Sequence, residues 1–218
     1  MWGLLDRPPR KTKLPPRRTF RPTLETLETR DCPSPVITSF SATPTNMPGS
    51  RQVELRGTVS DSMVQNDTVM FTGVASGSTR PDSSGNFDYF TSASGLGTVT
   101  AIASGYTYGM MGMKTGTTTS EAVNALVTSG APTIASFNVI QGSGGTWTFS
   151  GHVCDESPYG IVVQFGGAWQ VAGLTATCDI HGNFSATFYL PSLTSGSVTA
   201  QCQDIWNLLS NTVIDPII

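Results

Sequence analysis

The chain has 218 residues, of which 12% are charged and 23 are glycine, and its formal net charge is −3. This length suits one large domain or two small ones and is enough to bury a core. Few charges with many glycine, serine, threonine and valine residues are typical of short strands joined by turns, so we predict an all-β protein without long amphipathic helices after residue 31. No apolar run reaches the length of a membrane span, and none is predicted.

Residues 1–35 form a basic, proline-rich N-terminal segment. Residues 1–31 hold eight basic and four acidic side chains, which makes their net charge +4 and leaves −7 for the rest of the chain. Five prolines within residues 1–31 oppose regular structure, and we expect this segment to be disordered. Nucleic-acid binding is not predicted, because the segment has almost no aromatic residues and the acidic remainder repels phosphate. The apolar start, residues 1–5, is too short for an ordinary signal peptide.

Within this segment, residues 21–35 read RPTLETLETRDCPSP. The repeated Thr-Leu-Glu, Arg30 and Pro33-Ser34 resemble the LExLExR…PS segment near the N-terminus of many predicted exported proteins of planctomycete bacteria. The resemblance implies export and an extracellular or cell-surface location. The alternative is a solvated, partly helical tail in which Leu24 and Leu27 dock on the body of the protein.

The body of the chain contains one pattern twice. Five short phrases recur 94 to 99 residues later: residues 37–40 at 134–137, 55–61 at 149–155, 69–73 at 163–167, 82–87 at 179–184, and 97–101 at 196–200. Small changes in spacing are what loop insertions produce. The repeat therefore predicts two copies of one structural module.

Each copy has about seven alternating segments in roughly 90 residues, which is typical of a β-sandwich of immunoglobulin size. We predict one module at residues 36–127, a linker at 128–133 and a second module at 134–218. Alternation places Trp147, Phe149 and Val153 on the core face of one strand. The phrase Asp-x-x-Gly-Asn-Phe, at residues 82–87 and 179–184, is predicted to form a hairpin whose Phe begins the returning strand.

This pattern resembles the bacterial immunoglobulin-like repeats of secreted and surface proteins, which often read G-x-V-x-D, D-x-x-G-x-F and G-x-V-x-A in order. The resemblance covers residues 36–218 and implies two tandem immunoglobulin-like modules. It implies little about function, because such modules act as spacers, adhesins and accessory domains. The first copy departs from the pattern where residues 104–119 replace the short final turn.

Three cysteines distinguish the second copy, and they are predicted to lie at one pole of it: Cys154, Cys178 and Cys202. We expect one disulfide and a spare thiol. Cys154 with Cys202 is the first choice, since their strands face each other across the sandwich. Strand parity opposes it, because Cys202 should point inward and Cys154 outward, so Cys178 remains an alternative partner.

Two metal sites are alternatives at this pole. Cys154, Cys178, His181 and Cys202 could form a tetrahedral zinc set, although there is no paired CxxC motif and an oxidising compartment consumes thiols. Asp155, Asp179 and Asp204 could hold calcium near the linker, although Asp at such positions commonly bonds its own backbone in a turn. The turn interpretation is preferred, and no cofactor is predicted.

Candidate binding surfaces are aromatic and thioether side chains in loops. Residues 104–119 of the first copy, which depart from the repeated pattern, supply Tyr106, Tyr108, Met110, Met111 and Met113. The second copy supplies Trp169 and Trp206. The alternative is that these side chains fold back over the end of a sandwich, which is favoured for Trp206.

Catalysis is not predicted, because the only two histidines, His152 and His181, stand in no nucleophile motif. We predict a non-enzymatic, exported or cell-surface protein with a structural or adhesive role, whose partner is a protein or a glycan. One alternative is a carbohydrate-binding accessory module that uses Tyr159, Trp169 and Trp206. A more distant one is a secreted hydrolase that depends on His181.

Overall fold

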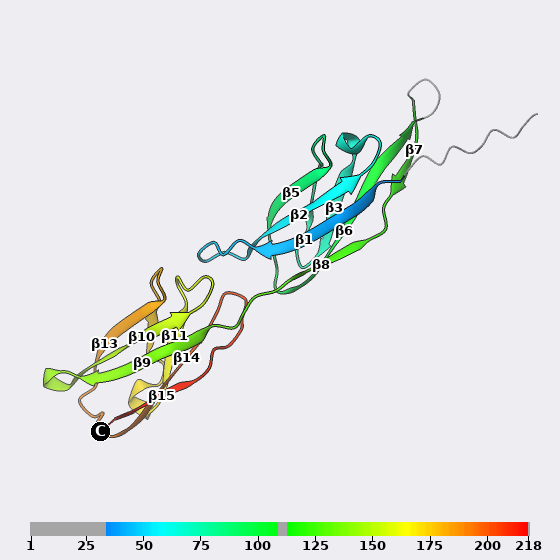
Figure 1. Ribbon diagram of the computed structural model, residues 1–218. Helices are drawn as coiled ribbons and strands as arrows, with labels where there is room; N and C mark the ends of the chain where they lie inside the picture. The colour runs from blue at the N-terminus through cyan, green and yellow to red at the C-terminus, as the bar shows by residue number, and fades with distance from the viewer. Residues whose placement is uncertain (1–33, 109–112, 218) are drawn as a thin grey trace, which may run out of the picture. The chain divides into compact units, whose positions relative to one another are not determined.

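The computed structural model describes residues 34–108 and 113–217 (Figure 1). The predictions about export and about the N-terminal segment before residue 34 lie outside the described residues, as do Met110 and Met111. The described residues are all-β, and the helical elements among them are three 3₁₀ turns of three residues each: η1 (Val64–Asn66), η2 (Ser143–Gly145) and η3 (Trp169–Val171). No helix among them is long and apolar enough to cross a membrane.

Two antiparallel sheets form the first immunoglobulin-like sandwich, which we call the first repeat. One sheet has the order β1-β2-β5, with β1 (Val36–Pro44), β2 (Gln52–Ser60) and β5 (Asn86–Ser92). The other contains β4 (Gly77–Thr79), β3 (Thr68–Gly73), β6 (Gly97–Tyr108), β7 (Lys114–Thr119) and β8 (Val123–Val127), where β7 and β8 both pair with β6.

The second repeat has the same strand order in two sheets (Figure 1). One sheet contains β13 (Asn183–Tyr189), β10 (Thr146–Cys154) and β9 (Thr133–Gln141). The other contains β12 (Thr175–Thr177), β11 (Val162–Gly167), β14 (Gly196–Gln203) and β15 (Val213–Ile217). The fold class is therefore the one predicted, two tandem immunoglobulin-like sandwiches. The module and linker boundaries themselves stay predictions.

The two repeats are alike in backbone detail. The β1–β2 pairing shifts register between Ile37 and Ser39, and the β9–β10 pairing does so at the matching place in β9. At Gly57, an added Cβ would lie 2.2 Å from the Ser39 carbonyl oxygen and 2.5 Å from Phe87 Cζ; at Gly151 the same distances separate it from the corresponding Ser136 and Phe184 atoms. Only glycine fits where the bulged strand and the Phe ring meet.

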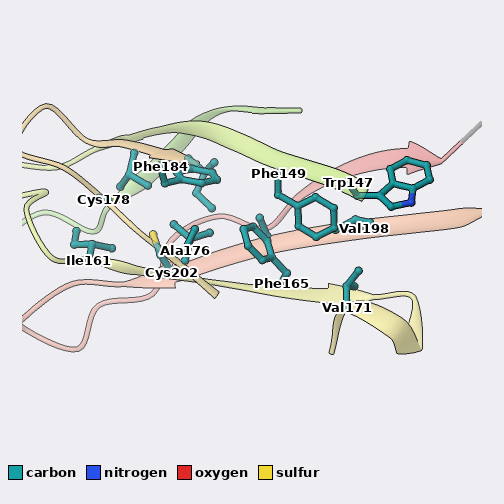
Figure 2. Close-up of a cluster of buried hydrophobic side chains, with 14 of the residues drawn as sticks. Trp147, Phe149, Ile161, Phe165, Val171, Ala176, Cys178, Phe184, Val198 and Cys202 are labelled. Carbon is teal, nitrogen blue, oxygen red and sulfur yellow. The ribbon is translucent and has the colours of Figure 1, made fainter. Parts of the chain in front are cut away.

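Each repeat has its own buried cluster, and alternation sets which residues enter it. Trp147, Phe149 and Val153 are buried as predicted, and they belong to the cluster of the second repeat. Phe149 meets Phe165 of the opposite sheet edge-to-face, with ring centroids 4.9 Å apart. Figure 2 shows Trp147 at one end of this cluster and Cys178 at the other.

The repeated Gly-Asn-Phe phrase forms the predicted turn but not the predicted hairpin. In the second repeat, Asp179 Oδ1 accepts hydrogen bonds from the backbone N–H groups of His181 (2.8 Å) and Asn183 (2.9 Å). Asp82 does the same in the first repeat. The strands on either side of each turn, however, belong to different sheets. The turn therefore crosses from one sheet to the other, and the hairpin prediction was wrong.

Candidate functional site

The three cysteines of the second repeat lie at one pole of it, as predicted. β10 ends at Cys154, Cys178 directly follows β12, and Cys202 is the last residue but one of β14. The parity prediction is confirmed as well. Cys178 and Cys202 are buried in the core, where Figure 2 shows both, whereas Cys154 is exposed.

None of these three cysteines forms a disulfide in the structure. Cys202 points into the core and Cys154 away from it, which separates the pair that was the first choice. Cys178 is no better placed for Cys202, because β12 and β14 lie on opposite sides of β11. Two strand spacings of about 4.8 Å exceed the Cα separation of about 7 Å that a disulfide tolerates. The geometry therefore favours three free thiols over the predicted disulfide.

We expect the three thiols to differ sharply in reactivity. Burial raises the pKa of the Cys178 thiol to about 12, and it also raises the pKa of Cys202. The chain has a fourth cysteine, Cys32, which the variant Cys32→Ser removes from the assay. Because the thiolate is the reactive form, this variant in its folded state should show one fast thiol, Cys154, in a colorimetric disulfide-exchange assay, and two more only in denaturant. Cys154→Ser should remove the fast phase. If only one thiol appears in the unfolded, unreduced protein, the predicted disulfide exists after all.

Cys154 and His152 form a small polar pair on the outer face of β10. The His152 Nε2 atom lies 2.9 Å from the carbonyl oxygen of His181, and its Nδ1 atom lies 3.5 Å from Cys154 Sγ. A proton on Nε2 can bond the carbonyl and leaves Nδ1 to accept from the thiol. His181 thus accepts this bond through its backbone carbonyl oxygen, and its ring takes no part in it.

The described residues contain no group of three His, Cys, Asp or Glu side chains arranged to hold a metal. The proposed zinc set is therefore not assembled: Cys154 faces outward, while Cys178 and Cys202 face the core. Binding of zinc or calcium at this pole stays a hypothesis from the sequence alone.

The three aspartates of this pole have different roles. Asp179 makes the turn described above, and hydrogen bonds from the backbone of Asn183 and His181 lower its pKa. Asp155 and Asp204 each use Oδ1 to accept a backbone N–H, at 2.7 Å from Ser157 and 2.7 Å from Leu208. Burial raises the pKa of both, and the Oδ2 atom of each is buried without a hydrogen-bond partner. Asp179 is therefore a turn residue, whereas Asp155 and Asp204 each keep one buried carboxylate oxygen without a partner.

The segment at which the first repeat departs from the pattern is a two-stranded ribbon, formed by the end of β6 and by β7. β3 pairs with β6 only as far as Ser104, so residues 105–108 pair with β7 alone (Figure 1). Tyr106 is 43% exposed and Met113 64% exposed, and Lys114 Nζ lies 3.6 Å from the Tyr106 ring centroid. The predicted binding residues Tyr106, Tyr108 and Met113 are therefore brought together on this ribbon.

The other aromatic candidates are not brought together. Trp169 is 78% exposed in η3, after the end of β11, whereas Tyr159 is exposed before its start. A six-residue strand is roughly 20 Å long, so the two rings cannot hold one small sugar. Trp206 is buried and packs in the hydrophobic cluster that contains Val53 and Leu55 of the first repeat. Packing thus covers Trp206, which agrees with the alternative favoured for this residue, that its side chain folds back over a sandwich.

A groove of about 630 Å³ on the first repeat was not predicted from the sequence. Its lining includes Arg56, Arg80, Asp82 and Asp88, so it offers charges of both signs. Arg56 lies 2.6 Å from Glu54 and 3.4 Å from Asp88. The lining residues come from separate segments of the chain, and no single motif connects them.

No family model matches this sequence, and no curated protein does. Among solved structures, the chain is similar to the BSP domain of a biofilm-associated protein, with 14% identity over 84% of this chain and 29% of that one (TM-score 0.28). It is also similar to the human OSCAR ligand-binding domain, with 15% identity over 85% of this chain and 98% of that one (TM-score 0.37). A third is a Parabacteroides merdae β-glucuronidase, with 10% identity over 84% of this chain and 24% of that one (TM-score 0.29). This chain thus spans less than a third of the length of the biofilm-associated protein chain and of the β-glucuronidase chain.

Proposed function

We propose that this chain is a non-enzymatic, exported immunoglobulin-like repeat protein with a structural or adhesive role, and that the β6–β7 ribbon is its contact surface. One observation carries the proposal: the ribbon extends beyond the pairing with β3 and exposes Tyr106, Met113 and Lys114. Aromatic and methionine side chains are enriched where proteins bind partners. The extracellular location is supported by two resemblances, that of residues 21–35 to a segment of exported proteins and that of residues 36–218 to repeats of secreted and surface proteins.

The immunoglobulin-like sandwich can form without the ribbon. In the second repeat, β14 and β15 are joined by the short segment 204–212, with no ribbon, and the sandwich is otherwise the same. The outer edge of β7, moreover, pairs with no strand among the described residues. An open strand edge can accept a strand from a partner, with main-chain hydrogen bonds providing affinity. The sandwich does not require the ribbon, and the free edge of β7 can pair with a strand of another molecule. Binding of a partner therefore explains the ribbon best.

The proposal is tested by replacing residues 106–117 with an Asn-Gly turn, which suits a two-residue connection between the paired residues Gly105 and Thr118 and keeps Gly105 in place. We expect a thermal midpoint close to that of the full chain and loss of adhesion by protein-coated beads to immobilised fibronectin, fibrinogen or a glycan array. Tyr106→Ala should weaken adhesion several-fold, whereas Ile140→Ala, at an even more exposed site of the second repeat, should not. Adhesion that survives loss of the ribbon contradicts the proposal.

The same array tests the carbohydrate-binding alternative, which the exposure of Trp169 favours. Exposed indole rings stack on apolar faces of ligands. Glycan binding that is independent of the ribbon but lost in Trp169→Ala, and kept in Tyr189→Ala, would replace the adhesive proposal with this alternative.

A further inference from the structure

Two carboxylates converge at the pole of the first repeat where β2 ends and β3 begins. Asp61 directly follows β2, and Asp67 directly precedes β3. Both lie over Gly105 of β6, since a Cβ added to Gly105 would be 2.5 Å from Asp67 Oδ1 and 3.2 Å from Asp61 Oδ2. The absence of a side chain at Gly105 thus makes room for the acidic pair.

Asp67 is the most buried charged residue among those described, with 1% of its surface exposed. Neither of its carboxylate oxygens accepts a hydrogen bond from an N–H or O–H group in the structure, and the neighbouring Asp61 carboxyl can hydrogen-bond to it only through a shared proton. No ion pair found in the described part of the chain involves Asp61 or Asp67. A buried carboxylate without a partner strongly destabilises a folded protein, so this pair requires a positive charge or a proton.

The second repeat places an acidic pair at the same pole by a different route. Asp61 corresponds to Asp155, and Gly105 corresponds to Asp204, as the strand registers show. In the first repeat the space of that second carboxylate is filled by Asp67, which the second repeat replaces with the apolar Ile161. One carboxylate of each pair thus comes from the same position in both repeats and the other from a different position, and each pair lies at the same pole. An unfavourable arrangement that is built twice indicates a ligand more than an accident of packing.

We propose that Asp61 and Asp67 bind a divalent cation, and that this cation is calcium. Carboxylate oxygens are hard ligands, and calcium accepts six to eight oxygens in flexible geometry, so two carboxylates can be completed by backbone carbonyls and water. Magnesium requires a more regular octahedron, and zinc prefers nitrogen and sulfur. The segment between β2 and β3 contains η1. Bound calcium would hold this segment against β6, beside the base of the ribbon.

The full chain, stripped with EDTA and then dialysed, is the protein to test. We expect 10 mM calcium chloride to raise the thermal midpoint by roughly 3–5 °C, as a site with a dissociation constant near 1 mM would do, and magnesium chloride to raise it less. Asp67→Asn should abolish the calcium response. Asp88→Asn, which removes an exposed carboxylate from the same repeat, should keep it.

Calorimetric titration with calcium chloride gives a second readout that does not depend on unfolding. Asp61→Asn is expected to weaken binding at least tenfold, and it serves if Asp67→Asn fails to fold. A calcium response that persists in both variants but disappears in Asp155→Asn would place the site in the second repeat and overturn the assignment. No response to calcium, together with a stabilised Asp67→Asn protein at pH 8, would show that the pair holds a proton and no metal.

Discussion

Replacement of Gly57 by alanine is expected to destabilise the protein by about 3 kcal/mol, at the upper end of what overpacking costs. The new Cβ would lie 2.2 Å from the carbonyl oxygen of Ser39 and 2.5 Å from the Phe87 ring. The backbone cannot yield easily, because the bulge in β1 and the pairing with β5 hold Gly57 on both sides. Urea unfolding followed by tryptophan fluorescence and circular dichroism measures the loss.

Gly95→Ala is the matched control, since no atom lies within 4 Å of a Cβ at that position. Its effect should stay within about 0.5 kcal/mol. Gly151→Ala should cost as much as Gly57→Ala, because the contacts of Gly151 repeat those of Gly57. Equal, small effects at Gly57 and Gly95 would mean that the bulge relaxes and that the shared backbone geometry is not a constraint.

Stability in EDTA is expected to fall as the pH rises from about 4 to about 7, because of Asp67. Burial, followed by the nearby Asp61 carboxylate, raises the pKa of Asp67 from 3.8 to about 7. The folded protein therefore holds a proton that the unfolded chain has released over this range. The stabilisation is complete below the unfolded pKa and is lost as the pH passes the folded one, at up to about 1.4 kcal/mol per pH unit.

The difference between the original protein and Asp67→Asn isolates this effect from other titrating groups. The amide cannot ionise, so Asp67→Asn should show a flatter pH profile and should be the more stable protein at pH 8. Asp88→Asn should follow the original profile. Parallel profiles for all three proteins would show that Asp67 titrates normally and that its buried oxygens have partners in solution.

The sequence alone was sufficient for the fold class and for much local structure. Alternating apolar residues such as Trp147, Phe149 and Val153 define a core face from their spacing, because side chains alternate along a strand. The turn at Asp179 could be predicted because its hydrogen bonds join residues only two and four positions apart. The alternation of side chains along a strand likewise predicted that Cys154 lies outside the core and Cys202 inside it.

Tertiary structure decided everything that depends on which strands become neighbours. The strand after each Gly-Asn-Phe turn joins the opposite sheet, which a repeated local phrase cannot reveal. β11 separates Cys178 from Cys202, and packing covers Trp206. Asp67 has the sequence context of an ordinary surface residue, yet the chain buries it beside Asp61 over Gly105. Periodicity and turn chemistry act over a few residues, whereas burial and cross-sheet proximity arise from contacts between segments far apart in the chain.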